Sequence, residues 1–115
     1  MEIKIIKKPI NKKEVADMAK EQFGDLIKAT IDTDKEIIAL GGELHADEEA
    51  FLIEQEESSC KYLWGINLYP RKSEKDWIEF DSMINIKPSL KNYSRNVEDL
   101  KVQKKIKSIV RKLIN

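Results

Sequence analysis

Two segments in the middle of the chain alternate between apolar and other residues, and this alternation restricts the folds that the chain can adopt. In residues 62–69 one side carries Trp64, Ile66 and Leu68, and residues 77–86 alternate in a similar way. Side chains two apart share one face of a strand, so each segment predicts a strand with one apolar face. Strands covered on both faces read instead as continuous apolar runs. We therefore expect an antiparallel sheet that helices cover on one face, with a polar face left open.

The rest of the chain supplies further strands and two long helices. Three more strands are expected, at residues 2–7, 27–32 and 37–41. Asn11 is placed to cap a helix that stops at Gly24, and a second helix covers about residues 100–114. Residues 47–55 are ambiguous, with a short helix favoured. These elements predict a two-layer α+β fold, in which a mostly antiparallel sheet of about five strands carries the two main helices on one face.

Length and composition bound the class of protein. A chain of 115 residues with 41% hydrophobic residues is expected to form one domain, residues 1–115, with one continuous core. The lone Cys60 cannot form an internal disulfide. No apolar run is long enough for a membrane span, and the first ten residues lack the pattern of a signal peptide. A cytoplasmic location is therefore expected.

Charge is distributed unevenly, although the formal net charge is zero. Residues 32–57 hold ten acidic residues and one basic residue, whereas residues 86–115 hold nine basic residues and two acidic ones. The two regions either neutralise each other within the fold or act as docking patches, and the first interpretation is favoured. Nucleic acid is not expected as a partner, because no basic sheet rich in aromatic residues resembles an RNA-binding module.

A cluster of ligand-type side chains follows the two adjacent glycines at positions 41 and 42. If this stretch is extended, Glu43, His45 and Asp47 point the same way, because side chains two apart share a strand face. Together with Asp81 they are candidate ligands for a divalent metal, the one cofactor that the sequence suggests. The spacing matches no strong metal motif, so a solvated acidic surface with His45 at the core edge or in a helix cap remains the alternative.

A second group of polar side chains is suited to a small polar ligand or a phosphate. The candidate ligand-binding residues, which offer an aromatic ring, amides, carboxylates and a guanidinium group, are Trp64, Asn67, Glu79, Asp81, Asn85 and Arg95. In the alternative interpretation Asp81 and Asn85 tie down loops and Arg95 neutralises a neighbouring carboxylate. Trp77 is expected on the opposite face from Trp64, where it could line a pocket or a dimer interface.

Four stretches of the sequence resemble an uncharacterised prokaryotic family of small single-domain proteins, known only as a domain of unknown function. The stretches are GGELHADEE, LWGINLYP, EFDSMINIKPS and NYSRNVED, and the resemblance extends over essentially the whole chain. It implies no activity. It does imply that one set of residues acts as a group: His45, Asp47, Trp64, Asn67, Asp81, Asn85 and Arg95.

Function is therefore predicted from the candidate sites alone. No catalytic motif is recognisable, and the glycines lack the spacing of a phosphate-binding loop. This favours a non-catalytic binding or interaction module that uses the polar face of its sheet, for a homo-oligomer or another protein partner. The alternative is a metal-assisted hydrolase in which Glu43, His45, Asp47 and Asp81 hold the ion and Arg95 stabilises developing charge. Whether the protein is an enzyme is left open.

Overall fold

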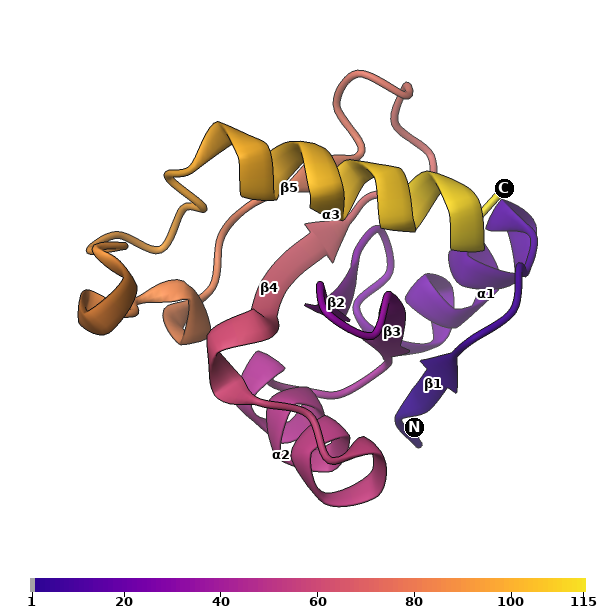
Figure 1. The fold of residues 1–115 in the computed structure, drawn as a ribbon. Helices are drawn as coiled ribbons and strands as arrows, with labels where there is room; N and C mark the ends of the chain where they lie inside the picture. The colour runs from indigo at the N-terminus through magenta and orange to yellow at the C-terminus, as the bar shows by residue number, and fades with distance from the viewer. Residues whose placement is uncertain (1) are drawn as a thin grey trace.

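The computed structural model describes residues 2–115, and its centre is a five-stranded sheet (Figure 1). The strands are β1 (Lys4–Ile6), β2 (Ile27–Asp32), β3 (Ile37–Leu40), β4 (Leu63–Leu68) and β5 (Ile78–Glu79). Their order across the sheet is β1-β3-β2-β4-β5, and every neighbouring pair is antiparallel. The predicted α+β class and the five-stranded antiparallel sheet are confirmed.

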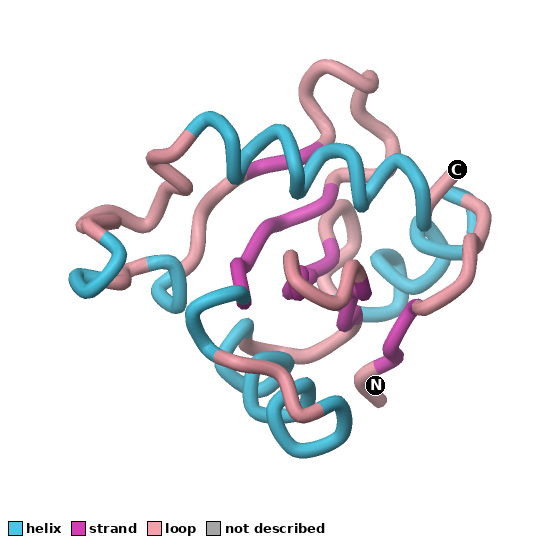
Figure 2. Tube along the Cα trace, viewed as in Figure 1, coloured by secondary structure: helices cyan, strands magenta, loops and turns pink. Residues whose placement is uncertain are grey.

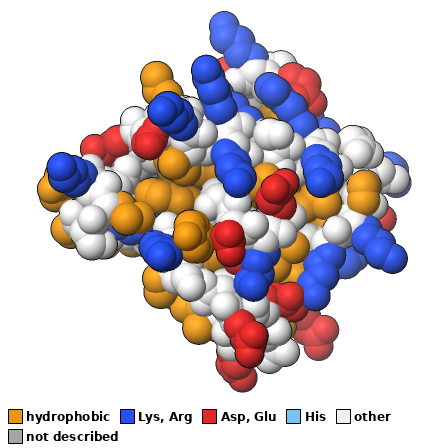
Figure 3. All heavy atoms as spheres, in the orientation of Figure 1, with side chains coloured by type: hydrophobic (Ala, Val, Ile, Leu, Met, Phe, Trp, Pro, Cys, Tyr) orange, Lys and Arg blue, Asp and Glu red, His pale blue; other side chains and the backbone are white. Residues whose placement is uncertain are grey.

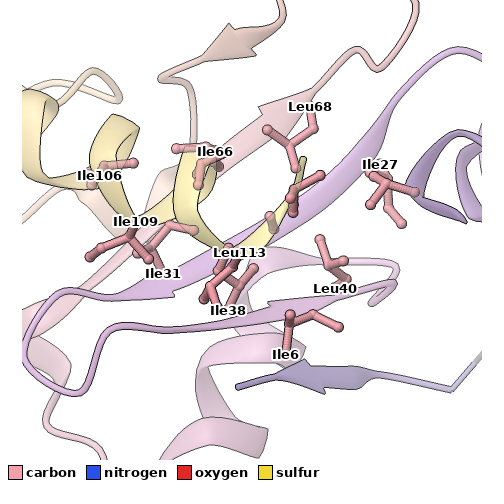
Figure 4. Close-up of a cluster of buried hydrophobic side chains, with 14 of the residues drawn as sticks. Ile6, Ile27, Ile31, Ile38, Leu40, Ile66, Leu68, Ile106, Ile109 and Leu113 are labelled. Atoms are coloured by element: carbon pink, nitrogen blue, oxygen red, sulfur yellow. The ribbon is translucent and has the colours of Figure 1, made fainter. Parts of the chain in front are cut away.

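Two helices, α1 (Lys12–Gln22) and α3 (Leu100–Leu113), cover one face of this sheet. The side chain of Asn11 accepts a hydrogen bond from the Glu14 backbone N–H, so the predicted helix cap is confirmed. Apolar side chains recur along α3 at helical spacing and meet the inward side chains of the strands (Figure 4). The main core therefore lies between these two helices and the sheet.

The third helix, α2 (His45–Glu56), lies on the opposite side of the strands from α3 (Figure 1). Its Leu52 packs against Ile37, Ala39 and Leu63. The expectation of an open polar face is therefore wrong where α2 covers the sheet. Residues 37–40, with the sequence IIAL, are entirely apolar, which is the pattern of a strand covered on both faces.

The second alternating segment, residues 77–86, forms much less strand than predicted. Strand β5 ends at Glu79, and a short 3-10 helix, η2 (Met83–Asn85), follows. The Asn85 side chain explains the break, because its Oδ1 accepts a hydrogen bond from Gly65 N and its Nδ2 donates to Gly65 O. The amide group therefore pairs with β4 in place of a strand backbone.

Most of the chain between β5 and α3 is loop, with short helical turns (Figure 2). These turns are η2 and a second 3-10 helix, η3 (Pro88–Leu90). Another 3-10 helix, η1 (Cys60–Tyr62), lies earlier in the chain, directly before β4. The last residues of the chain return to the segment before α1, where Ile10 and Ile114 form a parallel bridge. Within residues 2–115, no helix is both long and apolar enough to cross a bilayer.

Candidate functional site

The predicted metal-ligand group does not form the expected array. Leu44 is the residue immediately before α2 and His45 is the first residue of the helix, so the stretch from Glu43 to Asp47 is not an extended strand. Glu43 and Asp47 are exposed, whereas His45 is buried against the sheet. Residues 2–115 contain no group of three or more His, Cys, Asp or Glu side chains that could hold a metal ion. The structure therefore does not bring Glu43, His45, Asp47 and Asp81 into one metal-binding set.

His45 lies over β4 and is a neutral hydrogen-bond donor. Its Nε2 is 2.7 Å from the carbonyl oxygen of Ile66, and this oxygen can only accept, so Nε2 carries the proton. Burial of the ring lowers the pKa of His45 to about 4, against a smaller opposing effect of this hydrogen bond. The charges of Asp81 and Arg95 also act on the imidazole group. The side chain is therefore uncharged at neutral pH.

Four of the predicted ligand-binding residues do come together, beside the N-terminus of α2. Asn67 Nδ2 donates to Glu79 Oε1 at 2.8 Å and to the Asp81 carbonyl oxygen at 3.4 Å. Arg95 Nε donates to Asp81 Oδ1 at 2.6 Å, and both side chains are about half exposed. These bonds join the segment after β5 to β4 and to the loop before α3. The arrangement matches the interpretation in which Arg95 neutralises a carboxylate and Asp81 holds a loop in place.

Asn85 is also part of this scaffold, although it is buried. Besides its two bonds to Gly65, its Nδ2 donates to the Arg95 carbonyl oxygen at 2.9 Å. Gly65 has no side chain where η2 and α2 meet the sheet, and a Cβ there would lie 2.5 Å from Ser82 Oγ and 3.0 Å from His45 Cδ2. The polar layer beneath α2 is therefore closely packed rather than open to a ligand.

Trp64, the remaining predicted residue, is separated from this group because it points to the opposite face of the sheet. It belongs to the main core and is 5% exposed. Trp77, which was considered for an interface, is completely buried in the same core. An interface built on Trp77 is therefore wrong, since its ring has no exposed surface.

Trp64 forms part of the wall of a cavity of about 480 Å³ at the start of α3, here named the Trp64 cavity. Four segments of the chain line it: Thr33 and Asp34; Lys61, Tyr62 and Trp64; Leu90, Lys91 and Asn92; and Glu98, Asp99, Val102 and Lys105. Hydrophobic side chains reach the surface in the left half of Figure 3, where the loops before α3 lie. The cavity therefore combines an apolar wall with charged groups.

Two carboxylates of the Trp64 cavity are engaged by the protein itself. Asp99 Oδ1 caps α3 by accepting a hydrogen bond from Lys101 N at 2.8 Å. Glu98 Oε2 accepts three bonds, from Tyr93 N, Ser94 N and the Ser94 hydroxyl, each at 2.8 Å. These donors hold the pKa of Glu98 below its ordinary value.

A second cavity of about 500 Å³ adjoins the first and shares Lys61 and Leu90 with it. Its lining includes Glu49, Cys60 and Lys87. Burial lowers the pKa of Lys87, and its Nζ lies 5.3 Å from the centroid of the Trp64 ring. Lys87 therefore lies between the two cavities.

Sequence reasoning found Trp64 but missed the rest of the cavity lining, including Tyr62, Leu90, Val102 and Lys105. These residues come from two 3-10 helices, η1 and η3, and from helix α3, and no spacing along the chain relates them. The one available signal was the irregular polar stretch before the basic helix, because long loops in compact domains are often functional.

Comparison with known proteins places the chain without assigning it an activity. No curated protein and no solved structure matches it. One family model matches residues 4–113, which is nearly the whole chain, and its description is that of a protein of unknown function. This match confirms the resemblance found in the sequence: the chain belongs to the family DUF5674.

Proposed function

We propose that the protein is a non-catalytic binding module that takes a small molecule into the Trp64 cavity. The observation that carries this proposal is the cavity itself, which has a volume of about 480 Å³ and contains the side chains of Tyr62 and Trp64. Small-molecule sites commonly occupy roughly 300–1,000 Å³ and combine apolar or aromatic walls with a few polar groups. The polar face supports the same proposal less well, because α2 covers part of it and internal hydrogen bonds engage Asn67, Asp81 and Arg95.

The walls of the cavity are held in place before any ligand binds. Asn92, at the base of the loop wall, donates through Nδ2 to the carbonyl oxygens of Asn85, Ser94 and Asn96, and its Oδ1 accepts from Glu98 N. The opposite wall is helix α3, whose first turn Asp99 caps. A site built from fixed segments loses little conformational entropy on binding. This pre-organisation supports binding as the role of the cavity.

The chemical groups that line the cavity also favour binding over catalysis. The lining contains no histidine or cysteine. The carboxylates of Glu98 and Asp99 accept hydrogen bonds from the protein. These two carboxylates hold the backbone, and Asp34 is the one acidic group of the lining to which no bond is assigned among residues 2–115.

A fragment screen by ¹⁵N–¹H NMR tests the proposal. With a panel of small aromatic and aliphatic fragments, we expect the largest shift changes at residues that line the Trp64 cavity, including the Trp64 indole N–H. Tyr62→Ala should weaken these changes because it removes an exposed aromatic wall. Tyr93→Ala is the matched control, since Tyr93 is exposed but does not line the cavity.

Two results would overturn the proposal. The first is a panel in which no fragment shifts the resonances of the cavity lining. The second is a set of fragments whose shifts persist unchanged in Tyr62→Ala, because the fragments would then occupy another surface.

A further inference from the structure

We infer that the ligand of the Trp64 cavity is a small anion that carries an aromatic ring. This inference rests on the proposed function and adds the chemical class of the ligand. Three lysines, Lys61, Lys91 and Lys105, lie around the cavity and come from three different segments of the chain. They supply the ammonium groups that an anion requires.

These three ammonium groups have no internal counter-ion. In the part of the chain that the structure describes, no carboxylate oxygen lies within 4.0 Å of any of them. Four other lysines do form ion pairs, among them Lys4 with Glu14 and Lys7 with Glu56. An ammonium group has three N–H donors, so the three lysines offer donors that the protein does not use.

The three carboxylates of the lining differ in whether they already accept hydrogen bonds from the protein. The lining is formally neutral, because Asp34, Glu98 and Asp99 balance the three lysines. However, Glu98 and Asp99 already accept hydrogen bonds from backbone N–H groups. Of the three carboxylates in the lining, Asp34 is the one to which no hydrogen bond or ion pair is assigned among residues 2–115, and it lies on an exposed turn. The N–H donors of the three ammonium groups still outnumber the carboxylate oxygens of the lining that have no assigned bond in the described chain, which are both oxygens of Asp34, Glu98 Oε1 and Asp99 Oδ2. This excess favours a ligand that accepts hydrogen bonds through a negative charge.

The charge distribution of the surrounding surface also favours an anionic ligand. Residues 86–115 hold nine basic and two acidic residues, and Lys and Arg side chains lie along the α3 side of the molecule (Figure 3). The cavity opens at the first turns of α3, where Val102 and Lys105 line it. Both the basic surface and the positive end of the helix dipole attract an anion to this end of the molecule.

The aromatic part of the ligand follows from the apolar walls. Tyr62 is 37% exposed and Leu90 is 44% exposed, and Val102 is half-buried beside them. The Lys61 ammonium group lies 5.1 Å from the centroid of the Tyr62 ring. A ring packed on Tyr62 would therefore place an attached carboxylate, phosphate or sulfonate beside an ammonium group.

Two fluorescent probes with the same rings test the inference. One is 8-anilinonaphthalene-1-sulfonate, which is anionic, and the other is N-phenyl-1-naphthylamine, which lacks the sulfonate. We expect the full chain to bind the anionic probe about tenfold more tightly at low ionic strength. This preference should decrease as salt is added, because salt screens the ammonium groups.

Two triple variants separate the cavity from the general basic charge. Lys61→Gln, Lys91→Asn and Lys105→Gln together should abolish the preference for the anionic probe; asparagine suits position 91, where the backbone is left-handed. The control, with Lys101, Lys104 and Lys112 all changed to Gln, removes the same charge from α3 outside the cavity and should keep the preference. Near-UV circular dichroism shows whether each variant is folded, and the salt dependence of the wild-type protein tests the inference without any variant.

The outcomes distinguish this inference from the proposed function. Equal binding of the two probes, lost for both in Tyr62→Ala, would overturn the anion inference and leave the binding module in place. Failure of both probes to bind would count against both proposals. A preference that survives the cavity variant but disappears in the control would place the anionic probe on α3, outside the cavity, and would also overturn the inference.

Discussion

At Gly65 the backbone of β4 lies directly against η2 and the ring of His45. Because a Cβ at this position would lie 2.5 Å from Ser82 Oγ and 2.6 Å from Ser82 Cβ, Gly65→Ala forces two backbone segments apart. We expect it to lower the free energy of unfolding by about 1–3 kcal/mol, as overpacking does elsewhere. Urea denaturation measures this change. Adding Ser82→Gly should recover part of the loss, and an unchanged stability in Gly65→Ala would contradict the close contact.

His45 gives the protein a specific sensitivity to acid. Its pKa in the folded state is about 4, whereas an unperturbed histidine has a pKa near 6.5. Below pH 6.5 His45 binds a proton in the unfolded chain but not in the folded chain, so the free energy of unfolding falls as the pH drops toward 4. The total loss from this residue is expected to be roughly 3 kcal/mol.

His45→Gln tests this linkage, because a glutamine Nε2 can replace the N–H that donates to Ile66. Unfolding free energies of both proteins should be measured between pH 4 and pH 7. The variant should lose less stability than the wild-type protein over this range. Parallel curves would show that His45 is protonated in the folded state as readily as in the unfolded state.

At the scale of secondary-structure elements, α2 is attached to the sheet through a buried carboxyl group as well as through Leu52. Glu48 is completely buried, and it accepts hydrogen bonds from the Thr30 hydroxyl and from Gly42 N, both at 2.9 Å. Burial raises its pKa well above the ordinary value for a glutamate, and the two hydrogen bonds oppose the effect. The helix is therefore held by a polar contact whose protonation depends on folding.

Glu48→Gln should change how the stability depends on pH. As the pH rises above about 4.3, the unfolded chain releases the Glu48 proton while the folded chain keeps it, so the wild-type protein loses stability, by at most about 1.4 kcal/mol per pH unit. The variant lacks this loss, so its stability relative to the wild-type protein should increase with pH in urea denaturation. Glu54→Gln, at an exposed position of the same helix, is the control and should follow the wild-type curve.

The elements differ in how well the sequence predicted them, for reasons that lie in particular residues. The cap at Asn11 and the strand at residues 63–68 depend on local pattern, and both are confirmed. The alternation after Glu79 failed, because the Asn85 amide replaces strand pairing through a contact 20 residues away in the sequence. The burial of Glu48 was missed, since charged residues at the start of a helix usually indicate a solvated turn, whereas a place at the core edge was one of the alternatives given for His45.

At the scale of the whole molecule, the two ends of the described chain are joined. Ile10 N donates to the Leu113 carbonyl oxygen at 2.9 Å, and Asn115 N donates to the Ile10 carbonyl oxygen at 3.0 Å. Ile114, between these two bonds, is only 3% exposed and belongs to the main core. The end of α3 therefore stabilises the segment that leads into α1.

Ile114→Ala should destabilise the whole domain. Removing a buried isoleucine side chain typically costs about 2–5 kcal/mol, because the cavity left behind is not refilled. Thermal unfolding measures the change, and Ile53→Ala is the control because Ile53 is 40% exposed. If both variants unfolded at the same temperature, Ile114 would not link the two ends.

The candidate site could be predicted from the sequence only in part, because its components meet through the tertiary fold. Asn67, Glu79, Asp81 and Arg95, which the sequence placed in one candidate group, lie together and are joined by hydrogen bonds. The alternation also placed Trp64 on the apolar face, but its position at a cavity depends on the path of residues 88–99. No local pattern specifies that path, since it is fixed by side-chain amides such as Asn92.

The borders of the sheet have a consequence for self-association. The two outermost strands, β1 and β5, contain three and two residues, and beyond β5 the Asn85 side chain occupies the backbone groups of Gly65. A second copy of the chain would find very few free N–H and C=O groups with which to extend the ladder. The short edge strands therefore disfavour growth of a continuous intermolecular sheet.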